Sequence, residues 1–322
     1  MTPRLPLWFD EALEAPAIRQ DDLRSCDMPR QRVRFGWLRN PLVRLLVFGA
    51  TVLLGSLTAA TFVPGLLLGE VSGSILAVLQ VVIVVASYLV LVLALEGRRP
   101  PDELRPGRWP GLLVGLALGA LLFAACFGII ALFGGYRFEG VDPGYQWLEP
   151  VLMLGVGAGV AEELIFRGVL FRLLEEWLGT WFAAGISGLA FGFLHLGNPE
   201  ATIWGATAIA LEAGVMFALL YALTRSLWLV IGFHASWNLV QGPVLGVPVS
   251  GSGFSDGWLN TVTVGPDWLT GGSFGAEASL VTVALLVGFT IFLAVRLQHS
   301  AQVVEPVWSR RMELRDRQLS AG

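Results

Sequence analysis

Long runs of apolar residues alternate with short polar segments along most of the chain. A helix needs about 20 mostly apolar residues to cross a bilayer, and its backbone polar groups must be satisfied within the segment. The pattern therefore predicts eight membrane-spanning helices, of which the fifth is short. Their expected ranges are 43–69, 71–95, 110–134, 149–172, 182–197, 202–223, 227–248 and 277–297.

The same pattern divides the chain into a membrane domain and two polar tails. Residues 43–297 form the expected transmembrane domain, and the tails cover 1–42 and 298–322. The first forty residues lack the early apolar core of a signal peptide, so we interpret them as a retained tail. The apolar runs are too long and too continuous for barrel strands. The predicted fold class is all-α, a polytopic transmembrane helical bundle.

The positions of the basic residues predict the orientation of the chain. All 21 basic residues are arginine. With eight spans, nineteen of them fall on one side of the membrane, whereas Arg137 falls on the other. Basic residues concentrate in cytoplasmic segments. We therefore expect a multi-pass protein of the cell membrane, inner or plasma, with both termini in the cytoplasm.

Composition supports a membrane protein and excludes little else. Hydrophobic residues make up 55% of the chain and charged residues 14%, against about 25% charged residues in soluble domains. The net charge of −4 does not indicate a particular partner. We expect the protein to lie in the lipid bilayer and to bind no nucleic acid. Cys26 and Cys126 lie in segments of different kinds, so neither a disulfide nor a metal cluster is expected.

Two geometric expectations concern individual spans. Glycines recur every four residues at 111, 115 and 119, a spacing that predicts close packing against another helix. Counted from residue 182 at 1.5 Å per residue, His195 would lie about 20 Å above the cytoplasmic face, too far for a shared site. We therefore expect the fifth span to begin nearer Gly185.

The fourth span carries three charged residues, Glu162, Glu163 and Arg167. Ionisable groups in the hydrocarbon are costly, so each needs a reason. Glu163 and Arg167 are four residues apart and can pair on one helix face. Glu162 points about 100° away from Glu163 and is then free for other work. A charge cluster that only fixes helix packing is the alternative.

Polar residues also interrupt spans five, six and seven. Span five ends with Phe191-xxx-His195, and span seven contains His234-xxx-Asn238, whose two polar residues share a helix face. The alternatives are an interfacial histidine and a polar packing pair between helices. Glu212 in span six either hydrogen-bonds a neighbouring helix in protonated form or lines the same cavity. We leave Glu212 out of the catalytic set.

Together these residues supply the groups that peptide hydrolysis needs, an activated water and stabilisation of the oxyanion. Glu162 can take the proton from water, and His195 can hold the same water. His234 and Asn238 can both present N–H groups to an oxyanion. Arg167 can neutralise Glu163, so that the site does not bury two bare carboxylates.

Three motifs on successive apolar spans resemble the CPBP family, which includes the Rce1-type CAAX prenyl endopeptidases and the bacterial Abi-like proteins. The motifs are Glu162-Glu163-xxx-Arg167, Phe191-xxx-His195 and His234-xxx-Asn238. Further matches lie at 195–199, 224–228 and 237–251. The resemblance covers about 149–251, and spans one to three and eight match only in hydropathy.

The resemblance implies an intramembrane endopeptidase whose cavity is reached from the cytoplasm or the bilayer. It implies that Glu162 and His195 activate water, that His234 and Asn238 form the oxyanion site, and that Glu163 and Arg167 support them. The resemblance does not imply the substrate or the oligomeric state. We expect membrane-embedded or membrane-anchored peptides, lipidated or not, as substrates.

The sequence leaves a metal-dependent alternative open, in which Glu162, His195 and His234 bind zinc. We predict that no cofactor is required. The HExxH helix that usually supplies two ligands is absent. Glu163 is the expected partner of Arg167, so it should not orient a ligating histidine. Asn238, one turn from His234, suits an oxyanion donor better than a zinc ligand.

Two other function classes remain as alternatives. A non-catalytic scaffold or bacteriocin-immunity protein of the Abi-like kind would predict the loss of one catalytic residue. A transporter also uses intramembrane Glu and His residues, but it would predict two similar halves with interrupted helices. The sequence contains all the catalytic candidates and no such repeat.

Overall fold

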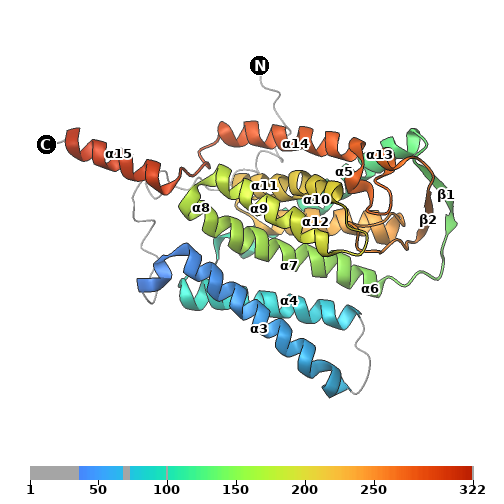
Figure 1. Cartoon of the computed structure of the whole chain (residues 1–322), viewed down its shortest axis with the longest axis horizontal. Coiled ribbons are helices and arrows are strands. Elements are labelled where there is room, and N and C mark those ends of the chain that lie inside the picture. The colour runs from blue at the N-terminus through green and yellow to red at the C-terminus, as the bar shows by residue number, and fades with distance from the viewer. Residues whose placement is uncertain (1–35, 68–72, 99–100, 321–322) are drawn as a thin grey trace.

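The computed structural model describes residues 36–67, 73–98 and 101–320, and it is a bundle of helices (Figure 1). Cys26 and most of the amino-terminal tail lie outside the described residues. The first helices are α3 (Pro41–Leu67), α4 (Gly73–Leu89), which continues as a π-helical segment Val90–Leu95, and α5 (Pro110–Leu132). Short 3-10 turns at Asp102–Leu104 and Pro106–Arg108 connect α4 to α5.

One continuous helix from residue 148 to 178 carries the acidic motif. It consists of α6 (Leu148–Pro150), a π-helical segment Val151–Ala158, α7 (Gly159–Glu163), a second π-helical segment Leu164–Phe171, and α8 (Arg172–Leu178). The next helix, α9 (Thr180–Leu194), follows directly after Gly179. Because α8 extends to Leu178, the fourth span ends six residues later than expected.

The second half of the bundle contains the remaining helices. They are α10 (Ile203–Ile209), a π-helical segment Ala210–Val215, α11 (Met216–Thr224), α12 (Leu227–Leu239) with a π-helical end Val240–Val244, α13 (Asp267–Thr270), α14 (Leu280–Gln298) and α15 (Val307–Ser320). In Figure 1, α14 and the α3–α4 pair lie on opposite sides of the bundle, with α9 to α12 between them.

All eight expected spans correspond to helical segments, and the protein is an all-helical, multi-pass membrane protein. Within the described residues, six helices are long and apolar enough to cross a membrane: Pro41–Phe62, Gly73–Leu95, Pro106–Leu132, Thr180–Gly197, Ile203–Thr224 and Leu280–Gln298. The other two expected spans are those that carry the Glu-Glu-Arg and His-Asn motifs. These two helices differ from the other six in the charged and polar residues that they contain.

Helices α5 and α12 pack at very short range. A Cβ atom added to Gly115 would lie 2.1 Å from the carbonyl oxygen of Leu229, and one added to Gly119 would lie 2.3 Å from that of Phe233. Only glycine fits at such contacts, so the predicted close packing is confirmed for these two positions. The contact holds α12, and with it the His-Asn motif, against α5.

The fifth span begins earlier than expected, and the reason lies in the length of the fourth. α9 begins at Thr180, so the expected start near Gly185 is wrong. Glu162 lies 16 residues before the end of α8, and His195 lies 15 residues after the start of α9. At 1.5 Å per residue these are about 24 and 22 Å, so both residues lie at the same depth.

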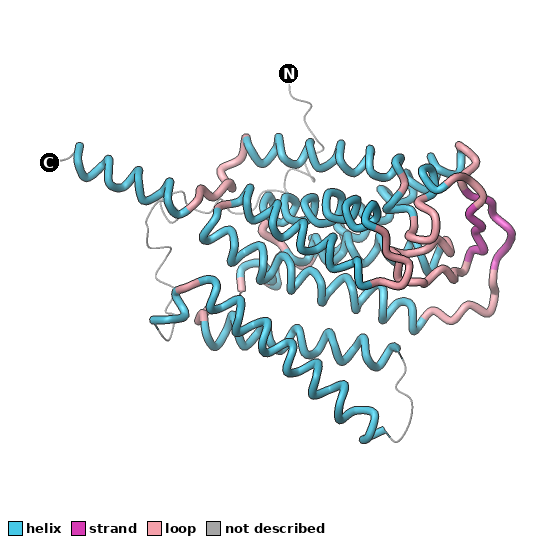
Figure 2. Tube along the Cα trace, viewed as in Figure 1, coloured by secondary structure: helices cyan, strands magenta, loops and turns pink. Residues whose placement is uncertain are grey.

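A short pair of strands joins two loops at one end of the bundle (Figure 2). β1 (Tyr136–Val141) pairs antiparallel with β2 (Leu259–Thr263), with an irregularity in register between Phe138 and Gly140. The sequence pattern did not predict these strands. They connect the loop after α5 to the loop after α12 at the same end of the bundle.

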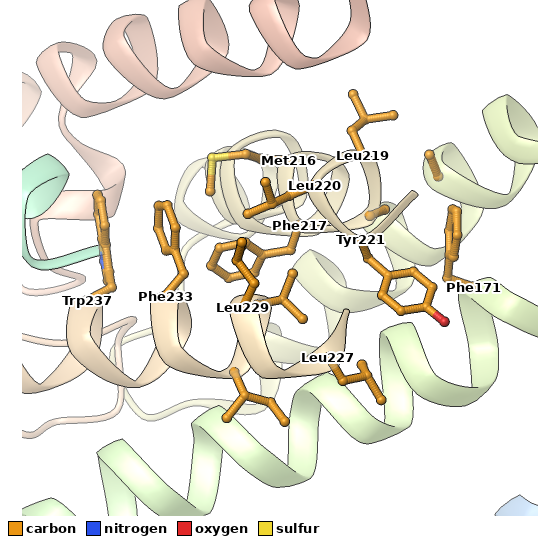
Figure 3. Close-up of a cluster of buried hydrophobic side chains, with 14 of the residues drawn as sticks. Phe171, Met216, Phe217, Leu219, Leu220, Tyr221, Leu227, Leu229, Phe233 and Trp237 are labelled. Carbon is orange, nitrogen blue, oxygen red and sulfur yellow. The ribbon is translucent and has the colours of Figure 1, made fainter. Parts of the chain in front are cut away.

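The core centres on α11, whose nine residues are all buried. Figure 3 shows the labelled side chains of α11 next to those of α12, with Tyr221 beside Phe171 of the long helix. The ring of Phe217 lies 5.0 Å from that of Phe233, and the ring of Phe123 meets that of Trp237 edge-on at 5.0 Å. These contacts position α12 from both sides.

The opposite end of the bundle, where most arginines lie, is held by buried ion pairs. Arg44 of α3 pairs with Glu96 at 2.9 Å and with Glu176 of α8, and Arg172 of α8 also pairs with Glu96, at 3.0 Å. Arg98 also lies 3.6 Å from Glu96, which is fully buried, so three guanidinium groups compensate its charge. The network ties the first two spans to the long helix.

Glu103, in the loop before α5, belongs to the same end. Tyr88 donates a hydrogen bond of 2.6 Å to its carboxylate, and Arg98 pairs with it. Burial by itself would raise the pKa of Glu103, but the charges of Arg98 and Arg172 lower that pKa to about 2. Glu103 is therefore ionised at neutral pH and anchors the loop.

Candidate active site

Glu163 is the centre of the polar site. Its side chain is fully buried, and its Oε1 atom accepts hydrogen bonds from Arg167 Nη1 at 2.9 Å and from His234 Nδ1 at 2.8 Å. The predicted pairing of Glu163 with Arg167 is confirmed. The expectation that Glu163 orients no histidine is wrong, because its Oε1 atom accepts a hydrogen bond from His234 on α12 as well as one from Arg167 on its own helix.

Arg167 is enclosed on all sides and is 1% exposed. Its Nη2 donates to the carbonyl oxygens of Ala213 and Gly214, at 2.8 and 3.0 Å. Both carbonyls belong to the π-helical segment Ala210–Val215, whose wider turn frees backbone acceptors. The guanidinium also lies 4.5 Å from the centroid of the Phe191 ring. Arg167 thus joins the long helix to α9 and to the helix of Glu212.

The contact with Glu163 determines how His234 presents its ring. A carboxylate can only accept, so Nδ1 of His234 carries a hydrogen and donates it. Its other nitrogen, Nε2, is then left for the cavity described below. The imidazole lies 5.4 Å from the Phe217 ring and 6.0 Å from the Phe191 ring, centroid to centroid. The ring is therefore held by one hydrogen bond and two aromatic neighbours.

His195 is arranged in the same way at the end of α9. Its Nδ1 lies 2.9 Å from the carbonyl oxygen of Phe191. Because a carbonyl accepts, Nδ1 donates, and Nε2 makes no hydrogen bond to another described residue. The residue begins a short 3-10 turn, His195–Gly197, where the helix ends.

Glu162 lies on the helix face that is turned toward α9. Phe166, one turn later on that face, meets Phe191 edge-on with centroids 4.9 Å apart. The long helix and α9 run antiparallel in Figure 1. Glu162 comes one turn before Phe166, and His195 comes one turn after Phe191. Because the two helices are antiparallel and the two phenylalanines are in contact, Glu162 lies at the level of His195. Among the described residues, no hydrogen bond joins these two side chains directly, and Oε2 of Glu162 has no partner.

A small cavity lies between α9, α11, α12 and α14. It has about 30 Å³ of space for water-sized molecules, enough for one or two waters. Its apolar wall includes the rings of Phe217, Phe233 and Trp237 (Figure 3). The polar residues in the wall are His195, Glu212, His234, Asn238, Ser250 and Glu277.

The cavity unites three of the four expected catalytic residues. His195, His234 and Asn238 all line it, whereas Glu162 is not part of its wall. Asn238 is buried and donates from Nδ2 to the carbonyl oxygen of Leu154 at 3.2 Å. Glu212 also lines the cavity, and neither of its carboxylate oxygens has a hydrogen-bond partner in the described part of the chain. Of the two roles left open for Glu212, the structure favours the cavity.

One polar residue of the cavity wall escaped the sequence patterns entirely. Glu277, just before α14, is 4% exposed and accepts hydrogen bonds from Ser250 N at 3.1 Å and Ser250 Oγ at 2.7 Å. Gln241 Nε2 donates to its other oxygen at 2.5 Å. The available signal was a single acid at the start of an apolar span. Ser250 itself has φ of +49°, an uncommon backbone conformation for a residue other than glycine.

The residues fit a metal only in part. The hydrogen bond from His234 to a carboxylate is of the kind that orients zinc-bound histidines. Among the described residues, however, no three His, Cys, Asp or Glu side chains are grouped so as to hold a metal ion. The alternative set Glu162, His195 and His234 is thus not assembled as a ligand group, and metal independence stays a prediction.

Fold and site together define a class: a multi-pass helical membrane protein with a buried Glu-Arg-His cluster beside a cavity lined by histidine and carboxylate groups. Residues 144–240 match the family of type II CAAX prenyl endopeptidase Rce1-like proteins. This part of the chain is similar to that family, and the resemblance based on the three motifs is confirmed. All three motifs fall within the matched residues.

One relative with a descriptive name matches part of the chain. YdiL of Bacillus subtilis, named as a candidate membrane peptidase, is 31% identical over 88 residues, which are 27% of this chain and 34% of that protein. The chain thus matches about a third of the length of this relative. No solved structure matches the chain.

Proposed function

We propose that the protein is an intramembrane endopeptidase that hydrolyses peptide bonds of membrane-associated or lipidated protein and peptide substrates. The observation that carries the proposal is the convergence of three separate motifs. Glu163, Arg167 and His234 are joined by direct hydrogen bonds, and His195, His234 and Asn238 line one cavity. The Rce1-like match and the relative named as a candidate membrane peptidase support the same reaction class.

In this proposal Glu162 is the general base. It removes a proton from a water that His195 also holds through Nε2, and the hydroxide attacks the scissile carbonyl carbon. The equal depth of Glu162 and His195 supports their joint action on one water. The proton that Glu162 has taken then passes to the leaving amine as the C–N bond breaks.

His234 and Asn238 stabilise the oxyanion of the tetrahedral intermediate. Asn238 has a second Nδ2 hydrogen besides the one given to Leu154. His234 uses Nδ1–H for Glu163, so it can donate from Nε2 only as an imidazolium. Glu163 and Arg167 are positioning residues, because they orient His234 without touching the substrate. Two such donors in a water-poor site are typical of oxyanion stabilisation.

The test compares membrane peptides from a strain that lacks the gene and carries either the wild-type chain or Glu162→Gln. The wild-type chain should yield cleavage products that are absent with Glu162→Gln, although both proteins accumulate. Glu149→Gln, an exposed glutamate on the same continuous helix, is the matched control and should behave as wild type. Identical peptide profiles for wild type and Glu162→Gln would instead support the non-catalytic scaffold.

A further inference from the structure

Glu212 is a buried acid that the proposed hydrolysis does not use. It is 1% exposed, and both carboxylate oxygens are buried without a hydrogen-bond partner in the described part of the chain. Buried polar groups are nearly always paired, and an ionisable residue inside a membrane protein is a candidate functional group. The missing partner therefore needs an explanation.

The nearest guanidinium does not supply that partner. Arg167 donates to the carbonyl oxygens of Ala213 and Gly214, the two residues that follow Glu212, and to Glu163. The π-helical segment Ala210–Val215 presents these carbonyls to Arg167 while Glu212 lines the cavity. Single π-helical turns are frequent at functional sites. Arg167 therefore reaches the backbone of Ala213 and Gly214 but does not pair with the side chain of Glu212.

The cavity is rich in hydrogen-bond acceptors. Glu212 contributes two unpartnered oxygens, and His195 contributes Nε2, since its Nδ1 hydrogen is already donated to the carbonyl oxygen of Phe191. Glu277 adds a second carboxylate that is held by neutral donors. No arginine belongs to the cavity wall in the described part of the chain. A group that fits this wall must bring several N–H or O–H donors, and a positive charge favours it further.

We propose that Glu212 and Glu277 form a subsite for a primary ammonium group next to the proposed catalytic histidines. An ammonium offers three donors on a compact cation. The available space of about 30 Å³ suits this water-sized group better than a planar guanidinium. The chain contains no lysine, so no side chain of its own can supply the ammonium.

Two sources share this chemistry. One is a lysine side chain of the substrate near the scissile bond, for which Glu212 would determine specificity. The other is the new amino terminus that hydrolysis releases, for which Glu212 would be the counter-ion. Both sources rest on the proposed function, but the ammonium subsite itself can be tested without turnover.

The binding test uses the full-length protein in detergent and follows its thermal unfolding by tryptophan fluorescence. A ligand that binds the folded state raises the unfolding temperature in proportion to its saturation. n-Butylammonium should raise it, whereas 1-butanol and tetramethylammonium should not. Glu212→Gln should need at least about tenfold more n-butylammonium for the same rise, and the matched control Glu200→Gln, in an exposed loop, should respond as wild type.

An unchanged response in Glu212→Gln would overturn the subsite. If this variant fails to accumulate, Glu212→Asp replaces it, and the wild-type series alone is decisive, since equal effects of n-butylammonium and 1-butanol also overturn the proposal. A protein that binds n-butylammonium through Glu212 but cleaves no peptide would refute the proposed function and leave the subsite standing.

A peptide that the protein cleaves distinguishes the two sources of the ammonium group, the substrate lysine and the new amino terminus. A lysine source predicts that replacing a flanking lysine by norleucine lowers kcat/KM at least about tenfold in wild type and not in Glu212→Gln. A product source predicts that the released fragment inhibits wild type, that its N-acetylated form does not, and that Glu212→Gln removes the difference. If neither pattern appears, both sources are refuted, and the subsite is then judged by the n-butylammonium series alone.

Discussion

Removing the Glu163 carboxylate should unfold the protein more readily than any other single change at the site. Glu163→Ala leaves Arg167 buried with a charge that is no longer neutralised, which costs about 3–5 kcal/mol. It also removes the hydrogen-bond acceptor of His234, an additional cost of about 1–3 kcal/mol if the ring stays unpaired. The two costs together are about 4–8 kcal/mol, so the unfolding equilibrium should shift by about 10³–10⁶-fold.

The assay is reversible unfolding in mixed detergent micelles, followed by circular dichroism. Glu149→Ala, an exposed position on the same continuous helix, should change stability little. The double variant Glu163→Leu with Arg167→Met removes both charges, and a buried ion pair replaced by apolar groups of similar volume is often nearly neutral. It should therefore be more stable than Glu163→Ala, yet fail to cleave because His234 has lost its acceptor.

Two results would refute this reasoning. One is a loss of less than about 1 kcal/mol in Glu163→Ala, which would mean that the buried charge of Arg167 is compensated elsewhere. The other concerns the double variant Glu163→Leu with Arg167→Met. If its loss of unfolding free energy equals the sum of the losses in Glu163→Leu and Arg167→Met measured singly, the two residues are not coupled, although contacting partners should show a coupling energy.

Three further predictions concern the donor, the metal and the topology. Asn238→Ala should lower kcat by about 10²–10³-fold, as for the loss of one oxyanion donor, and unchanged kcat would remove Asn238 from the oxyanion site. Cleavage by purified protein should survive a strong chelator; activity that disappears, returns with zinc and follows one bound metal per chain would establish the metal mechanism. Reporter fusions at residue 104 and at the carboxyl end should be cytoplasmic and one at residue 258 extracytoplasmic, and a reversed terminus would contradict the eight-span topology.

Features that depend on local spacing were predictable from the sequence. The hydrophobic runs gave all eight helices with ends that differ from the structure by a few residues, because the cost of exposing backbone to lipid dictates their length. The Glu163–Arg167 pair followed from a spacing of four. The glycines at 115 and 119 predicted a close helix contact, although not that α12 would be the partner.

Features that depend on how helices face each other were not predictable. The contact from Glu163 to His234 joins residues 71 positions apart, and nothing in either motif specifies it. Glu277 is held in the cavity wall by hydrogen bonds from Ser250 and Gln241, and the segment before α14 that contains Glu277 has no periodic pattern. The start of α9 was misplaced because the depth of His195 was judged against a fourth span that ends at residue 172, whereas α8 continues to Leu178.

The central claim is that Glu162 activates the attacking water, and one measurement tests it most directly. Single-turnover cleavage of a peptide identified from the membrane profiles is compared for wild type, Glu162→Gln and Glu149→Gln in the same detergent. Loss of a general base should slow the chemical step by at least about 10²–10⁴-fold in Glu162→Gln, with peptide binding retained and Glu149→Gln at the wild-type rate. A Glu162→Gln protein that cleaves as fast as wild type would contradict the account.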